Sequence, residues 1–95
     1  MEIKDRLRAL REEKGLTLDM LVYDMNNRFN IEINKGLVSK WENGRNDPSL
    51  KYGKYLAQYY DVSLDYLVGL TDIKLPSRLL AYTKRIAQLQ EDEDA

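Results

Sequence analysis

Hydrogen-bond donors gather on one side of a short helix that the sequence predicts after Asn34. Val38 and Trp41 are three residues apart, a spacing that places both on one face and suits burial in a core. The outward positions hold two cations, a hydroxyl and a glycine: Lys35, Gly36, Ser39 and Lys40. The inward face anchors this helix, and the outward face has the chemistry of a surface that recognises a polar partner.

Catalytic and metal-binding side chains are scarce in this chain. It contains no His and no Cys, so the usual general bases, nucleophile activators and zinc ligands are missing. We therefore expect no enzyme, no metal site, no cofactor and no small-molecule substrate.

Length and charge limit the partners further. Ninety-five residues suffice for one small domain with a single core. The formal net charge is −1, but Lys35 to Lys54 hold five basic and two acidic residues, whereas Asp61 to Ala95 hold four basic and seven acidic ones. The basic footprint is local, which suits a polyanionic partner at that place only.

Targeting signals are not evident. The chain begins with charged residues, and no run approaches the roughly 18 apolar residues of a membrane span. We expect a soluble, cytoplasmic protein with no membrane partner.

Two helices are predicted before the donor-bearing one. Ile3, Leu7 and Leu10 recur at helical spacing and end at Lys14-Gly15. Thr17 is a good N-cap for a second helix that begins beside Leu18 and reaches at least Met25.

Residues 26–33 allow two interpretations. They extend the second helix through Phe29, four residues after Met25, or they form a longer loop whose Phe29, Ile31 and Ile33 tuck back onto the core. The Asn-rich composition favours at least one break.

Gly44 is suited to end the donor-bearing helix, and Pro48-Ser49 to open the next. This fourth helix is expected to carry four residues inward: Leu50, Leu56, Ala57 and Tyr60. Asp61 takes the place of a terminating glycine, since Asp tolerates the left-handed conformation. Ser63 caps a fifth helix with apolar Leu64, Tyr66, Leu67 and Leu70.

A sixth helix is predicted over about residues 76–90, beginning at Pro76 and followed by an acidic tail. Its apolar residues follow a seam-like spacing: Leu79, Tyr82, Ile86 and Leu89. This seam packs on the domain's own core or forms a two-fold homodimer contact.

Three stretches resemble the lambda repressor-like helix-turn-helix family of the Xre/Cro type. They are Ser39-Lys40-Trp41-Glu42-Asn43-Gly44 with Pro48-Ser49-Leu50, the segment from Arg6 to Thr17, and Val62 to Gly69. The resemblance implies an all-α, five-helix DNA-binding domain over residues 1–70; the connector and the predicted C-terminal helix follow over residues 71–95. The chain departs from the family's tight turn between the second and third helices, because it has about six additional residues there.

The resemblance assigns roles to individual residues. Base contacts fall to Lys35, Gly36, Ser39 and Lys40, where Lys can donate to guanine O6 and N7. Phosphate contacts fall to Thr17, Leu18, Asn34, Asn43, Arg45 and Lys51. Leu18 replaces the family's usual Gln and cannot bond to phosphate through its side chain, so we expect Arg28 to supply that contact. Arg11 and Glu42 match a partly buried structural pair.

The function implied is a sequence-specific regulator that binds double-stranded operator DNA, most simply a phage or prophage repressor acting on a palindrome. The alternative is an antitoxin-like or adaptor module that uses the same fold to bind a regulatory protein partner.

Overall fold

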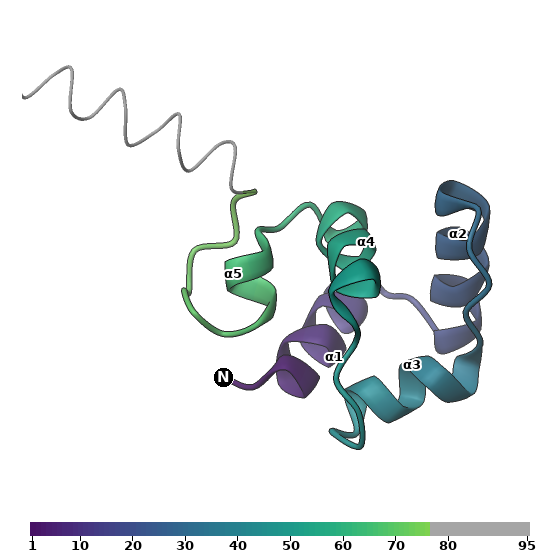
Figure 1. Ribbon diagram of the computed structural model, residues 1–95, viewed down its shortest axis with the longest axis horizontal. Helices are drawn as coiled ribbons and strands as arrows, with labels where there is room; N and C mark the ends of the chain where they lie inside the picture. The colour runs from purple at the N-terminus through teal and green to yellow at the C-terminus, as the bar shows by residue number, and fades with distance from the viewer. Residues whose placement is uncertain (77–95) are drawn as a thin grey trace, which may run out of the picture.

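Five helices make up the part of the chain that the computed structural model describes, residues 1–76. They are α1 (Ile3–Glu13), α2 (Leu18–Phe29), α3 (Lys35–Glu42), α4 (Leu50–Tyr60) and α5 (Leu64–Leu67) (Figure 1). These residues form no strand, and the predicted all-α, five-helix fold is confirmed. The predicted sixth helix and its seam of Leu79, Tyr82, Ile86 and Leu89 lie outside the described residues.

Side-chain caps fix where the helices begin. Four helices start after a residue whose side-chain oxygen accepts a backbone N–H in the first turn: Thr17, Asn34, Ser49 and Ser63. The predicted left-handed turn at Asp61 is confirmed, with φ of 53°. Position 69 requires glycine for a steric reason, because a Cβ there would clash with the Met1 carbonyl oxygen.

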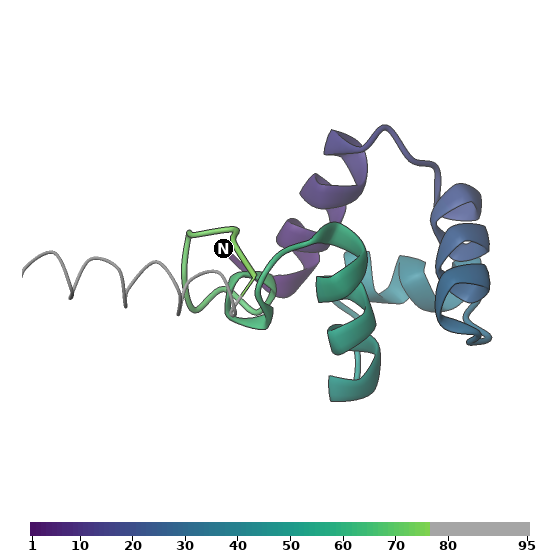
Figure 2. The ribbon, with the colours of Figure 1, turned by 90° about the horizontal axis from the view of Figure 1, so that it is seen from above.

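The core lies between the five helices, each of which contributes buried apolar side chains. Val38 and Trp41 are each 2% exposed, which confirms the predicted inward face of α3. The prediction that Leu50 points inward is wrong, since its side chain is 82% exposed. Figure 2 shows the reason: the first turn of α4 extends beyond the other helices, so no neighbour covers it.

The additional residues before α3 are divided between helix and loop. α2 continues to Phe29 and stops at Asn30, which adopts φ of 52°. The chain then runs back along α2 to reach α3 (Figure 1). Ile33 is buried, while Phe29 and Ile31 pack partly against the core. Each interpretation of residues 26–33 therefore holds for part of the segment.

Asn26 binds the returning segment to α2. Its Nδ2 donates to the Ile33 carbonyl at 2.9 Å, and its Oδ1 accepts the Ile33 N–H at 2.8 Å. One side chain thus satisfies both backbone groups of a buried residue, as a neighbouring strand would do.

Arg11 and Glu42 join α1 to α3, as predicted. Nε and Nη2 of Arg11 donate to the two carboxylate oxygens at 2.8 and 2.9 Å, and Nη1 donates to the Leu16 carbonyl at 2.8 Å. The hydrogen bonds to Glu42 raise the pKa of Arg11, although partial burial opposes them. Glu42 is only 4% exposed, so Arg11 supplies the hydrogen bonds that water would otherwise give its carboxylate.

Replacing Glu42 with Ala should lower the free energy of unfolding by about 3 kcal/mol, because it leaves the Arg11 guanidinium in a partly buried site without its carboxylate. Urea denaturation measures the change. Glu13→Ala is the matched control, because Glu13 pairs with Lys74 at the surface and should cost less than about 1 kcal/mol. Equal losses for the two variants would contradict the structural role of Glu42.

Asn26→Ala should cost about 2 kcal/mol in the same measurement, since it leaves the Ile33 N–H and carbonyl without partners. Asn27→Ala should stay within about 0.5 kcal/mol, because Asn27 is exposed and its amide bonds only to the Tyr23 carbonyl of the same helix. If Asn27→Ala is as damaging as Asn26→Ala, the returning segment is held in another way.

Candidate nucleic-acid interface

The outward face of α3 carries the four residues predicted to read bases. Lys35, Gly36 and Lys40 are exposed, and Ser39 is partly exposed beside them. Lys35 Nζ also lies 3.7 Å from Asp19 Oδ2, at the start of α2. The returning segment has therefore brought the beginning of α3 next to the beginning of α2.

The two asparagines that were predicted to contact phosphate form hydrogen bonds within the protein. Asn34 caps α3, with Oδ1 accepting the Leu37 N–H at 2.8 Å. Asn43 Nδ2 donates to the Ser39 carbonyl at 2.8 Å and lies 3.1 Å from Ser39 Oγ. The Asn34 amide nitrogen is still able to donate outward, whereas the Asn43 amide is occupied by α3 itself.

Thr17 and Leu18 form the first turn of α2. The Thr17 side chain caps Met20, and Leu18 packs partly against the core. The first amides of a helix have no partner within it and attract anions, so the predicted backbone contacts are available here. The exposed carboxylate of Asp19 lies in the same turn and opposes these contacts, because it repels an anion.

Arg45 and Lys51 are both exposed, one just after α3 and one in the first turn of α4. Two basic side chains thus lie beyond the end of α3, where a phosphate backbone would pass if α3 occupied a groove.

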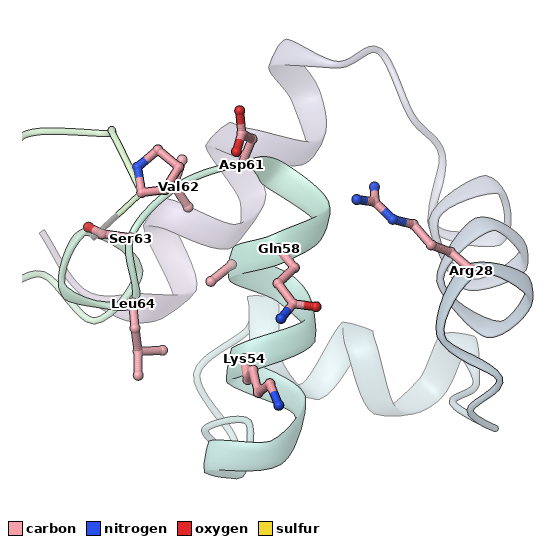
Figure 3. A pocket seen from close by; sticks show the side chains of 9 residues that line it. Arg28, Lys54, Gln58, Asp61, Val62, Ser63 and Leu64 are labelled. Atoms are coloured by element: carbon pink, nitrogen blue, oxygen red, sulfur yellow. The ribbon is translucent and has the colours of Figure 1, made fainter. Parts of the chain in front are cut away.

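Arg28 is not brought to this face. It follows Leu18 by ten residues along α2, about 15 Å by helical rise. Its guanidinium lies over the Phe29 and Tyr59 rings, at 5.2 and 5.9 Å from their centroids. Figure 3 shows it pointing toward α4, across a groove of about 510 Å³ that also includes Lys54, Gln58 and Asp61. Arg28 therefore does not replace the amide missing at Leu18.

Arg8 is a residue of this face that the sequence analysis missed. Its Nη2 donates to Asn43 Oδ1 at 3.0 Å and to the Glu42 carbonyl at 3.3 Å. Arg8 precedes Arg11 by three residues, so its helical position already placed it on the side of α1 that faces α3.

The described residues contain no cluster of three or more potential metal-ligating His, Cys, Asp or Glu side chains. Within residues 1–76, no helix has the length and apolar character needed to cross a bilayer.

Comparisons with known proteins agree with this geometry. A family model described as helix-turn-helix matches residues 30–67. A protein of Bacillus subtilis named as the HTH-type transcriptional regulator YobD is 39% identical over 67 residues, covering 70% of this chain and 54% of that protein. The HTH-type transcriptional activator BcrR of Enterococcus faecalis is 28% identical over 69 residues, covering 73% of this chain and 31% of that protein. No solved structure matched the chain.

Proposed function

We propose that this chain is a helix-turn-helix transcriptional regulator of the Xre/Cro type, and that it binds operator DNA in a sequence-specific manner through α3. The observation that carries the proposal is the pair of faces on α3. Val38 and Trp41 are buried in the core, while Lys35 and Lys40 are exposed on the opposite side and Ser39 is partly exposed beside them. A helix presented in this way fits the major groove, with its early residues toward base edges.

The surroundings of α3 support the same docking. The first turn of α2 supplies backbone amides for one phosphate strand, and Arg45 and Lys51 supply positive charge beyond the other end of α3. Phosphate neutralisation needs such local charge, so an acidic chain can still bind DNA.

Repression is the simplest outcome of this binding. A protein that occupies an operator excludes polymerase sterically, and it needs no further contact to do so. We propose repression of this kind, by occupancy of a palindromic operator.

Substitutions on α3 test the proposal. Lys35→Ala and Lys40→Ala should each weaken a specific complex by about tenfold, because each removes a donor to a base edge. Arg45→Ala should weaken specific and non-specific complexes alike and reduce the salt slope by about one. A salt-dependent mobility shift with full-length protein measures both effects.

Lys54→Ala is the control for lost charge, because Lys54 lines the groove beside Arg28 (Figure 3) and is not among the residues assigned to DNA. It should leave specificity unchanged. If neither α3 lysine affects the specific complex more than Lys54 does, α3 is not the reading element.

A homodimer would explain recognition of a palindrome, and we propose one formed at the α5 end of the domain. Four large apolar side chains are exposed in the segment that follows α5: Val68, Leu70, Ile73 and Leu75. Arg6 holds this connector through Asp72 at 2.6 Å, so the apolar residues are presented by a fixed segment. They lead directly into the predicted seam of Leu79, Tyr82, Ile86 and Leu89.

Ile86→Asp should therefore convert a dimer into a monomer in sedimentation velocity, because it places a charge within the predicted apolar seam. Thr83→Asp, at a position between the seam residues, is the matched control and should leave the dimer intact. A wild-type protein that sediments as a monomer at the concentrations that bind DNA would contradict the proposal.

A protein-binding module is the second candidate, and one observation favours it. Tyr23 and Met20 are 71% and 49% exposed on α2, with Asp19 and Asp24 at their sides. An apolar strip bordered by carboxylates suits a basic protein surface better than it suits DNA. Tyr23→Ala should leave DNA binding intact and weaken only such a complex.

A further inference from the structure

Two arginines of α1 share one carboxylate at the end of α3. Arg11 binds both carboxylate oxygens of Glu42, and Arg8 Nε lies 3.8 Å from Glu42 Oε1. One negative charge therefore faces two guanidiniums, both of which stay protonated, so one positive charge is left in excess. The Arg11 side chain is 17% exposed, whereas the Arg8 side chain is 49% exposed. The excess charge is thus open to solvent on Arg8.

The end of α3 holds the Arg8 side chain in place. Arg8 Nη2 donates to Asn43 Oδ1 at 3.0 Å and to the Glu42 carbonyl at 3.3 Å. Asn43 is itself held by α3, because its Nδ2 donates to the Ser39 carbonyl at 2.8 Å. Within residues 1–76, Arg8 Nη1 donates to no group. The guanidinium is therefore fixed through one nitrogen and has donors left on another.

Arg45 adds a second exposed cation at the same end of α3. Its backbone N–H donates to the Lys40 carbonyl at 3.0 Å, so Arg45 follows the last turn of this helix directly. Exposed cations from α1 and from the loop after α3 thus lie at the C-terminal end of α3. A phosphate strand that passes this end would meet both of them.

Lys4 lies one turn before Arg8 but is less able to bind an anion. It packs against the turn that follows α3, since a Cβ at Gly44 would lie 2.9 Å from Lys4 Cδ. Two carboxylates accompany it: Glu2 Oε2 lies 3.7 Å from the Lys4 ammonium, and Asp47 lines the same hollow. Arg8 is therefore the cation of α1 that is best placed to bind phosphate here.

We infer that Arg8 makes the phosphate contact at the C-terminal end of α3, and that Asn43, to which the family motif assigns this contact, is its positioning residue. The Asn43 amide bonds within the protein, whereas Arg8 has excess charge and spare donors beside it. A hydrogen bond to phosphate from a cation is about twice as strong as one from a neutral amide. The inference rests on the proposed DNA-binding function and extends that surface to α1.

The salt dependence of DNA affinity measures the charge contact. Arg8→Ala should reduce the slope of log affinity against log salt by about 0.9, the value for one neutralised phosphate of B-DNA. Over the decade between about 0.1 M and 1 M salt, that slope equals about an eightfold change in affinity. A selected duplex and a scrambled duplex should be affected alike, because phosphate contacts carry no sequence information. Mobility shifts with full-length protein provide both slopes.

Lys14→Ala is the matched control, because Lys14 is an exposed cation just after α1 whose ammonium lies 4.5 Å from the centre of the Tyr59 ring on α4. It should reduce the slope by less than about 0.3. Arg8→Lys should keep the wild-type slope, because it retains the charge. If Lys14→Ala lowers the slope as much as Arg8→Ala does, or if Arg8→Lys has the slope of Arg8→Ala, the inference is wrong.

A double-substitution cycle tests the positioning role of Asn43. Asn43→Ala should weaken binding to both duplexes by about threefold, because Arg8 loses a hydrogen bond that holds it to α3. In the Arg8→Ala background the same substitution should have no further effect, since the residue that it positions is gone. A general loss of stability would instead appear in both backgrounds.

Full additivity of the two losses would mean that Asn43 contacts phosphate itself, and it would overturn the inference. A slope that Arg45→Ala lowers but Arg8→Ala leaves unchanged would also overturn it, with the proposed function intact. If the wild type binds no selected duplex more tightly than a scrambled one, the proposed function itself fails.

Discussion

The ion pair between Arg11 and Glu42 is the contact on which the presentation of α3 depends. A helix of eight residues is only about 12 Å long and too short to be stable alone, so tertiary contacts must set its direction. Arg11 binds both Glu42 and the Leu16 carbonyl, and so ties α1, the turn before α2 and the last turn of α3 together. Burying two charges adds little net stability, but it permits one geometry only.

The position of the N-terminal end of α3 depends on the extension of α2. A longer helix would normally carry the chain away from the groove-binding end of the motif. The left-handed turn at Asn30 reverses it, and the Asn26 amide holds the returning segment at Ile33. Lys35 consequently reaches Asp19 at the start of α2. The additional residues are accommodated without moving the outward face of α3 away from the first turn of α2.

Patterns within one helix were predictable from the sequence, and relations between helices were less so. The caps, the inward Val38 and Trp41 and the Arg11–Glu42 pair all follow from local spacing or from the family motif.

Leu50 has the right spacing for the core, but periodicity does not say where the neighbouring helices end. Arg28 and Arg8 show the same limit, since their partners lie far away in the sequence.

The central claim is that α3 and the beginning of α2 together form the surface that meets DNA. Backbone amide NMR spectra of the full-length protein, recorded while a duplex is added at low salt, test it most directly. The structure predicts the largest shifts at Thr17, Leu18 and residues 34–45, with small changes around Tyr23 and the groove beside Arg28. Largest shifts at Tyr23 or along α5, with residues 34–40 unchanged, would contradict the account.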